Sequence, residues 1–224
     1  MMWMVSHWFM LLLASVLSFI ISLLRRKNYG FSICKALLLT GIAAGAGCAG
    51  TKLLFWIENI GKPFSLLGGV SFYGAVFFVP LVFFVVSGLK ADRFKVQMDF
   101  IAPYIPLTAA FMRVACYFNG CCGSNYYIMG GQVVHPPVQL IECGWDLLLF
   151  GIMLILERRK WIRTGLLYPI FGVGYSVVRF GLEFIRDTPK NIAGLSIGQW
   201  LSIPAFLLSS LSFAYIIHVG GKKK

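Results

Sequence analysis

The sequence predicts an all-α integral membrane protein, a bundle of about seven transmembrane helices. Of its 224 residues, 58% are apolar and 12% are charged, and the mean hydropathy is +0.80. A soluble domain of this size cannot bury so much apolar surface, whereas the hydrocarbon core of a bilayer accepts it. The apolar residues also fall into segments of roughly 20 residues, the length that an α-helix needs to cross that core.

Seven such segments follow one another, so we expect a single polytopic membrane domain over residues 1–224. Basic residues follow the first segment rather than precede it, which is the reverse of a cleavable signal peptide. We therefore expect this segment to remain as a span, with an external N-terminus and, after seven crossings, a cytoplasmic C-terminus. The expected spans are 3–24, 33–56, 69–88, 97–116, 138–156, 165–185 and 197–218.

The formal net charge of +12 is carried by four clusters of Lys and Arg between or after the apolar segments, at 25–27, 90–95, 158–163 and 222–224. With the N-terminus outside, all four clusters lie on the cytoplasmic side, as the positive-inside rule requires. No basic stripe is interleaved with stacking aromatic residues, so the charge pattern excludes a nucleic-acid partner.

Glycines and prolines inside the expected spans predict close packing and bent helices. The second span contains "GIAAGAGCAG", whose small residues let two helix backbones approach each other. Prolines inside spans are tolerated where neighbouring groups or a cavity satisfy the freed carbonyls, so we expect a bundle that encloses a cavity. The residues are Gly41, Gly45, Gly47 and Gly50, and Pro80, Pro103, Pro106, Pro169 and Pro204.

Several charged residues fall inside or at the edge of the expected spans, where each costs on the order of 2.5–3.5 kcal/mol unless it is paired or hydrated. They are Lys52, Arg113, Glu142, Asp146, Arg179, Glu183 and Arg186. In the sixth span, Tyr175, Arg179, Glu183 and Arg186 lie within one arc of roughly 80°. An Arg179–Glu183 pair in adjacent turns would neutralise both charges, but it leaves Tyr175 and Arg186 on the same stripe unexplained. The stripe therefore favours a polar cavity or a lipid-headgroup site.

Polar residues from other segments are expected at the same, external end. The stretch "RVACYFNGCCGSNYY" (113–127) places Arg113 at the end of the fourth span, where it would either snorkel to the interface or bind an anion together with Asn119 and Gly120. Arginines that converge there would suit a lipid phosphate, which guanidinium groups bind through two hydrogen bonds. Further candidates are Tyr73 in "GGVSFYGA", His135, Gln139 and Glu142 in "HPPVQLIE", and Gln199 in "LSIGQW".

The six cysteines leave several interpretations open. Cys34 and Cys48 fall in the second span and are expected to be packing residues. Cys116, Cys121 and Cys122 lie at the external end, where they could pack in a turn, form a disulfide with each other or with Cys143, or supply a thiolate activated by Arg113. Zinc binding by these three cysteines and His135 is a further alternative, although the paired spacing of a zinc motif is absent. No metal and no cofactor are predicted.

Taken in order, "GGVSFYGA", "RVACYFNG", "HPPVQLIE", "YSVVRFGLEFIRD" and "SIGQWLSIP" resemble the signatures of the prolipoprotein diacylglyceryl transferase family. Those signatures have the forms GRxGNFxNGE, HPxQLYE, YxxxRFxxEFxR and MGQxLSxP, with a preceding glycine motif that ends in HG or YG. The sequence departs from them in places. Ala115-Cys116 replaces "GN", Cys121 replaces the glutamate, and an extra residue separates His135 from Gln139.

The resemblance implies a bacterial inner-membrane enzyme with its active site toward the outer face. Such an enzyme transfers the diacylglyceryl group of phosphatidylglycerol to the lipobox cysteine of a prolipoprotein and forms a thioether. By this resemblance the catalytic residues are Arg113, Arg179 and Tyr73. The phospholipid headgroup would be bound by Arg113, Asn119, Gly120, His135, Gln139, Glu142, Tyr175, Glu183, Arg186 and Gln199.

The expected partners are phosphatidylglycerol and the prolipoprotein signal peptide, bound by a monomer. Two alternatives stay open. One is a related lipid or acyl transferase with a different acceptor, in which Cys121 or Cys122 is a covalent nucleophile. The other is a lipid-binding or transport protein without catalysis.

Overall fold

The computed structural model describes residues 7–60, 69–129, 132–159, 162–190 and 193–221, and these are mostly helical. A helix, or two consecutive helices, occupies each of the seven apolar segments, as the all-helical prediction requires. A small antiparallel hairpin between the fourth and fifth segments is added to it. The elements are α1 (His7–Arg25), η2 (Arg26–Tyr29), α2 (Ile33–Glu58), α3 (Phe72–Val86), α4 (Ala91–Ile101), α5 (Tyr104–Phe118), β1 (Tyr127–Met129), β2 (Gln132–Val134), α6 (Val138–Arg159), α7 (Leu167–Leu182) and α8 (Ile197–Gly221).

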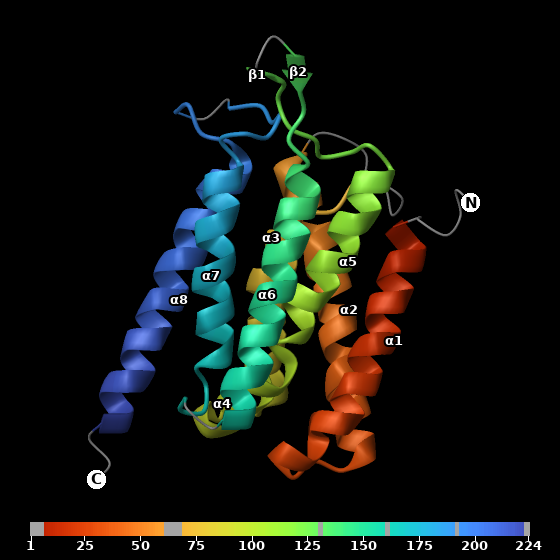
Figure 1. Ribbon diagram of the computed structural model, residues 1–224. Coiled ribbons are helices and arrows are strands. Elements are labelled where there is room, and N and C mark those ends of the chain that lie inside the picture. The colour runs from red at the N-terminus through yellow and green to blue at the C-terminus, as the bar shows by residue number, and fades with distance from the viewer. Residues whose placement is uncertain (1–6, 61–68, 130–131, 160–161, 191–192, 222–224) are drawn as a thin grey trace.

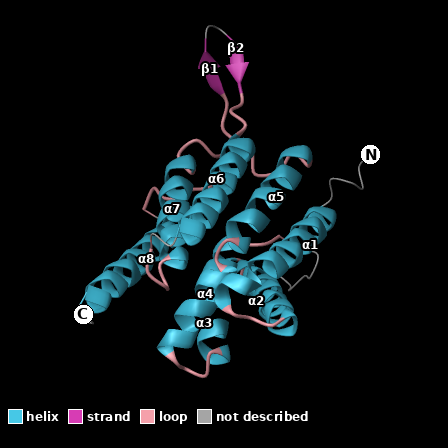
Figure 2. Cartoon of the chain, turned by 60° about the horizontal axis from the view of Figure 1, so that its bottom comes forward, coloured by secondary structure: helices cyan, strands magenta, loops and turns pink. Residues whose placement is uncertain are grey.

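The helices run up and down along one common direction, with the hairpin projecting from one end (Figure 1). The largest helix contacts are those of α2 with α3, α7 with α8 and α5 with α6. The view from below shows α5, α6 and α7 side by side (Figure 2). These three helices carry most of the charged residues predicted inside the spans, so the fold places those charges together.

Among the residues that the structure describes, five helical stretches are long enough and apolar enough to cross a bilayer: His7–Tyr29, Ile33–Glu58, Ala91–Phe118, Val138–Arg159 and Ile197–His218. The apolar helices α3 and α7 are shorter, at 15 and 16 residues. Large apolar side chains such as Leu12, Leu81 and Leu211 are more than 60% exposed, whereas Glu142 and Asp146 are buried. Apolar groups outside and charged groups inside are the arrangement expected of a protein dissolved in lipid, and the chain is a multi-pass membrane protein.

The fourth expected span is broken into α4 and α5. Ala102 and Pro103 form a turn between them, in which the Ile105 N–H donates to the Ala102 carbonyl at 3.2 Å. Proline lacks the N–H that would continue the hydrogen-bonding pattern of the helix. The structure therefore interrupts the helix at Pro103, one of the prolines from which the sequence predicts a bend. Pro80 and Pro204, by contrast, lie inside continuous helices.

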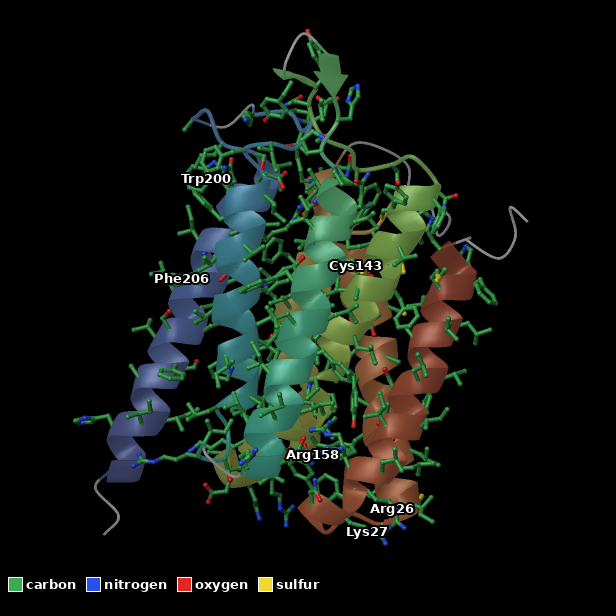
Figure 3. All side chains as sticks on the ribbon, viewed as in Figure 1. Arg26, Lys27, Cys143, Arg158, Trp200 and Phe206 are labelled. Atoms are coloured by element: carbon green, nitrogen blue, oxygen red, sulfur yellow. The ribbon has the colours of Figure 1, made fainter. Side chains whose placement is uncertain are left out.

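The end opposite the hairpin carries the basic residues. Figure 3 shows Arg26, Lys27 and Arg158 at this end and Trp200 at the other. Arg25 is buried there, in an ion pair with Glu157 at 2.7 Å, and it donates to the Phe100 carbonyl at 2.7 Å. Arg25 belongs to the first of the basic clusters that indicate topology, and in the structure it also connects α1 to α4 and α6.

A second anchor at this end fixes the start of α7. The Asp99 carboxylate of α4 accepts hydrogen bonds from the backbone N–H groups of Gly165 and Leu167. The first N–H groups of a helix have no partner within the helix, so a carboxylate placed there satisfies them and stabilises the positive end of the helix dipole. Asp99 therefore fixes the position of the first turn of α7 at the basic end of the bundle.

Small residues on α2 allow the close contact with α3 that the sequence predicted. A Cβ added at Gly50 would lie 2.5 Å from the Gly74 carbonyl oxygen, and one at Gly74 would lie 2.0 Å from the Gly50 carbonyl oxygen. The two backbones thus touch at this crossing. Gly45, on the same helix, has nothing within 4 Å of such a Cβ.

We predict that Gly50→Ala lowers the free energy of unfolding by about 1–3 kcal/mol, because the added methyl group forces α2 and α3 apart. Gly45→Ala is the matched control and should leave stability equal or slightly higher, since alanine favours the helix. Unfolding in mixed detergent micelles measures both. Equal stability of the two variants would mean that the α2–α3 contact tolerates expansion.

Candidate functional site

A cluster of charged side chains is centred on Glu142, in the first turns of α6. Its carboxylate pairs with three arginines: Arg113 of α5 at 2.8 Å, Arg186 after α7 at 3.1 Å and Arg179 of α7 at 3.6 Å. Helices α5 and α7 approach α6 from opposite sides, so a residue on the inner face of α6 can reach both. Figure 3 places Cys143, the chain neighbour of Glu142, in the half of the bundle toward the hairpin.

Arg179 is shared between two carboxylates. Its Nη1 atom lies 3.0 Å from Glu183 Oε2, one turn further along the chain, and 3.6 Å from Glu142 Oε2. The simple pair of adjacent turns weighed in the sequence analysis is therefore present, but it belongs to a larger network that also includes Arg186, as the common stripe indicated. Tyr175, on the same stripe, is buried.

The three arginines differ in exposure. The side chains of Arg113 and Arg179 are 12% and 14% exposed, whereas that of Arg186 is 2% exposed. Arg186 also donates to the Cys122 carbonyl at 3.2 Å, which ties the loop after α5 to the cluster. Arg186 thus connects Glu142 to the loop, and Arg113 and Arg179 are the more exposed of the three arginines.

The charges in these ion pairs do not balance, since three guanidinium groups face the two carboxylates of Glu142 and Glu183. A third carboxylate, Asp146, lies one turn below Glu142, is fully buried, and makes no hydrogen bond or ion pair with any described residue. Buried polar atoms without a hydrogen-bond partner in the described part of the chain also include Tyr175 Oη, Arg186 Nε and Gln199 Nε2. Such atoms cost free energy unless a ligand or water forms hydrogen bonds with them. The site therefore has donors and acceptors that could bind a further polar molecule.

Aromatic rings border the charged cluster on the side of α3. The Tyr73 ring meets the Tyr175 ring edge-on at 5.7 Å, and Phe72 lies 5.1 Å from Tyr175. The Tyr73 hydroxyl shares a hydrogen bond with Ser202 of α8. Tyr73 therefore joins α3, α7 and α8 below the cluster, and no ion pair or hydrogen bond among the described residues links it to the arginines.

Gly198 makes room for Glu183. A Cβ at Gly198 would lie 3.1 Å from the Glu183 carboxylate, which is closer than side chains normally approach. The same turn of α8 is capped by its own residues, because the Ser196 N–H donates to Gln199 Oε1 at 3.0 Å and the Gln199 N–H donates to Ser196 Oγ at 3.2 Å. This reciprocal pattern is a capping box, so the predicted ligand Gln199 has a structural role as well.

Asn119 and Gly120 do not enter the cluster; they end α5. Gly120 has a φ of +66°, its N–H donates to the Tyr117 carbonyl, and the Cys121 N–H donates to the Cys116 carbonyl. These two bonds form the Schellman motif that commonly closes a helix with glycine. The Asn119 side chain donates to the Ala115 carbonyl at 2.7 Å.

The "HPPVQLIE" residues are divided between three places. Glu142 is the centre of the cluster, and Gln139 is buried and donates to the Cys121 carbonyl at 2.9 Å, so it positions the loop. His135 is exposed and lies against Tyr126 at the base of the hairpin. The structure thus brings together Arg113, Arg179, Arg186, Glu142, Glu183 and Tyr175 of the predicted residues, with Tyr73, Gln139 and Gln199 beside them and Asn119, Gly120 and His135 apart.

All six cysteines are free thiols. His135 does not lie with Cys116, Cys121 and Cys122, whereas His7 of α1 lies near Cys116 and Cys121. A hydrogen bond from Cys116, and after it the charge of Arg113, lower the pKa of Cys122 to about 6. Cys122 is therefore the cysteine of the loop with the most thiolate character.

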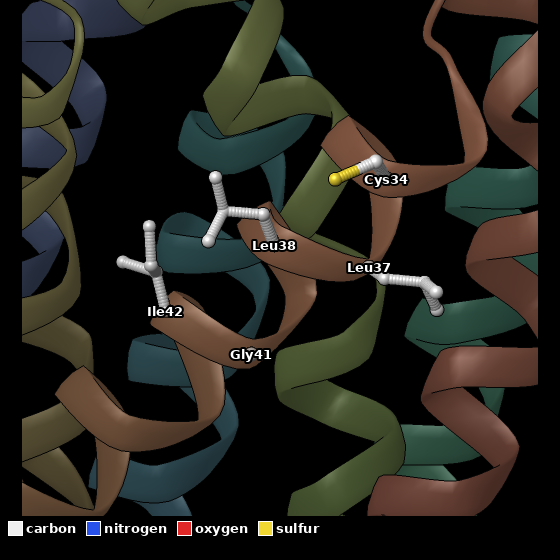
Figure 4. Close-up of a pocket in the computed structure, with 5 residues that line it drawn as sticks. All are labelled: Cys34, Leu37, Leu38, Gly41 and Ile42. Carbon is white, nitrogen blue, oxygen red and sulfur yellow. The ribbon is translucent and has the colours of Figure 1, made fainter.

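A shallow apolar groove lies on α2, lined by Cys34, Leu37, Leu38, Gly41 and Ile42 (Figure 4). These residues belong to the first turns of α2, next to the basic end of the bundle. The lining offers no charged or hydroxyl side chain, so the groove has none of the chemistry of the Glu142 cluster.

We predict that Glu142→Gln lowers the free energy of unfolding by about 3–5 kcal/mol, because it leaves three guanidinium groups without their common counter-ion. Asp187→Asn, on an exposed side chain of the loop that follows Arg186, is the matched control and should change stability little. Thermal unfolding of the detergent-solubilised protein compares the two. A Glu142→Gln variant as stable as the control would remove Glu142 as the centre of the network.

The chain is similar to one family of known proteins over most of its length. The profile of the family described as prolipoprotein diacylglyceryl transferase matches residues 4–215. Curated relatives named phosphatidylglycerol–prolipoprotein diacylglyceryl transferase include proteins from Idiomarina loihiensis (32% identical, 63% of this chain and 58% of the relative), Bordetella avium (34%, 62% and 58%) and Nitratidesulfovibrio vulgaris (28%, 76% and 69%).

The matched region covers less than two thirds of the first two relatives. The family profile, however, extends over nearly the whole chain, including every helix that contributes to the Glu142 cluster. The chain belongs to the prolipoprotein diacylglyceryl transferase family.

Proposed function

We propose that the protein transfers the diacylglyceryl group of phosphatidylglycerol to the lipobox cysteine of a prolipoprotein. The observation that carries this proposal is the pairing of three arginines with two carboxylates inside an apolar helix bundle. The substrates are those in the names of its relatives. A phosphodiester anion is the natural ligand for guanidinium groups in such a place, because the lipid phosphate carries one negative charge and two acceptor oxygens.

The reaction forms one bond and breaks one. The sulfur of the lipobox cysteine bonds to the phosphate-bearing carbon of the diacylated glycerol. The bond from that carbon to the phosphate oxygen breaks, and its electron pair stays on the oxygen. Glycerol phosphate leaves with an additional negative charge, and the thiol proton passes to a base. Cations held close to the leaving oxygen stabilise the charge that develops there, which is a major source of rate enhancement in water-poor sites.

Arg113 and Arg179 are assigned to the phosphate. They approach from different helices, they are the more exposed of the three arginines, and both share Glu142. A phosphate that enters can take over part of their hydrogen bonding while Arg186 retains Glu142 at 3.1 Å. Arg186, Glu142 and Glu183 act as positioning residues in this assignment, and Tyr73 and Tyr175 form an aromatic wall beside them.

The active site faces the outer side of the bacterial inner membrane in this proposal. The Glu142 cluster lies toward the hairpin end, and Arg26, Lys27 and Arg158 lie at the other end. Clusters of Lys and Arg remain in the cytoplasm when a membrane protein inserts. The prolipoprotein signal peptide would then approach from the outer half of the bilayer, and a monomer suffices because all the charged groups come from one chain.

The test is a reconstituted assay. Purified protein is placed in vesicles that contain phosphatidylglycerol labelled in its acyl chains, and a lipobox peptide is added. We expect labelled thioether on the peptide and release of glycerol phosphate, with neither product when phosphatidylethanolamine replaces the donor or serine replaces the lipobox cysteine. Lipid binding without product would support a non-catalytic lipid-binding protein instead.

A second candidate is a transferase in which Cys122 becomes covalently attached to the lipid. The lowered pKa of its thiol and its exposure favour this route. In the same assay, a Cys121→Ser, Cys122→Ser double variant should keep its activity if the lipobox thiol attacks the lipid directly. Loss of activity together with an acyl-labelled adduct on the wild-type loop would support the covalent route.

We predict that Arg179→Lys lowers the rate of thioether formation by roughly 10²–10³-fold, because an ammonium group cannot reproduce the planar fork that binds two oxygens. Arg26→Lys, the same change at the opposite end, is the matched control and should keep full activity. The rates are compared at equal amounts of folded protein.

A double variant separates structure from binding. Arg179→Met with Glu183→Leu removes both charges of the pair, an exchange that is often neutral for stability, and it leaves Arg113 and Arg186 on Glu142. We expect this variant to insert and fold but to be inactive. Near-normal activity would make Arg179 structural and assign the phosphate to Arg113 and Arg186.

A further inference from the structure

A second group of chemically active side chains lies outside the Glu142 cluster, where the start of α1 meets the end of α5. It comprises His7, Cys116 and Cys121, whose ligand atoms all lie within 4.8 Å of one another. His7 Nε2 is 3.7 Å from Cys116 Sγ and 3.7 Å from Cys121 Sγ. The proposed transfer reaction uses none of these three side chains.

The distances fit a tetrahedral metal ion. With zinc–nitrogen bonds of about 2.0 Å and zinc–sulfur bonds of about 2.3 Å, a tetrahedral angle separates nitrogen from sulfur by roughly 3.5 Å. Both nitrogen–sulfur separations in the structure are close to this value. One imidazole and two thiols also form a soft donor set, of the kind that selects zinc over magnesium or calcium.

The backbone holds the two sulfur atoms together. Gly120 turns the chain back, and the Cys121 N–H donates to the Cys116 carbonyl at 3.1 Å. Gln139 then fixes the Cys121 carbonyl from α6 at 2.9 Å. A pair of ligands presented by a closed turn is partly organised before the ion binds, which lowers the conformational entropy that binding must overcome.

A third sulfur is close by. Cys122 directly follows Cys121 in the chain, and its carbonyl accepts a hydrogen bond from Arg186. Its thiol does not belong to the group of ligand atoms within 4.8 Å of one another, so His7, Cys116 and Cys121 define the site.

We propose that His7, Cys116 and Cys121 bind a zinc ion. The ion fastens the beginning of α1 to the turn that closes α5, one helical turn beyond Arg113. This role differs from the zinc alternative of the sequence analysis, since the histidine is His7 rather than the distant His135.

The experiment measures metal binding and not activity. The full-length protein is purified in detergent, reduced, freed of metal and titrated with Co²⁺, which takes tetrahedral zinc sites and shows the charge-transfer absorption of cobalt–thiolate bonds. We expect saturation at about one ion per chain and bleaching of the absorption when Zn²⁺ is added. Elemental analysis after desalting should find zinc in the same ratio.

Three variants decide whether these residues are the ligands. His7→Ala, Cys116→Ser and Cys121→Ser should each weaken Co²⁺ binding at least tenfold, and Cys34→Ser, which removes an exposed thiol in another part of the chain, should not. His7 lies at the first position of α1, so its variant remains informative if a change at Cys116 impairs folding. Binding below one tenth of an ion per chain, absorption unchanged in the His7→Ala and cysteine variants, or a disulfide that resists reduction would each overturn the proposal.

Discussion

The carboxylate of Glu142 is the interaction on which the arrangement of the bundle depends. Three guanidinium groups in an apolar bundle repel one another and lose their hydration, and a single carboxylate at the point where they meet offsets both costs. Because the arginines come from α5, α7 and the segment after α7, the position of Glu142 on α6 fixes the spacing of all three. The helices that carry the charges can therefore be packed in few ways.

Other hydrogen bonds and ion pairs fix the position of these helices along their axes and their rotation about them. Asp99 holds the beginning of α7 at the basic end through two backbone N–H groups, while Arg179 and Glu183 hold its other end. Arg25 joins α1 to α4 and α6 at the basic end. The two ends of the molecule thus both bury charged groups: Arg25 and Asp99 are bound by protein groups at the basic end, and Glu142 pairs with three arginines toward the hairpin end.

The sequence was sufficient to predict the helices and the charged stripe, because both depend on local patterns. Apolar runs of fixed length identify spans, and the spacing of Tyr175, Arg179, Glu183 and Arg186 follows from helix geometry alone. The central position of Glu142 was less visible, since it depends on which helices become neighbours. Asp146 had a usable signal, a second carboxylate four residues after Glu142, but it was not assigned to the site.

Several predicted site residues have structural contacts that the sequence does not reveal. Asn119, Gly120 and Gln199 are suited both to bind a ligand and to cap a helix, and sequence alone does not distinguish these uses. In the structure all three cap a helix. His135 belongs to the hairpin rather than to the cluster, and Gly198 acquires its importance only from Glu183 on another helix. The proximity of His7 to Cys116 and Cys121 likewise depends on α1 packing against α5.

The shortness of α3 and α7 has a consequence for the lipid itself. At 1.5 Å per residue, helices of 15 and 16 residues are about 22–24 Å long, less than the roughly 30 Å of a hydrocarbon core. The bilayer beside these two helices is expected to become thinner to match them, as it does around a span that is shorter than the hydrocarbon core. The headgroup layer is then expected to lie closer to Arg179, which is near the end of α7, and under the proposed function this shortens the distance that a lipid phosphate has to move to reach the guanidinium groups.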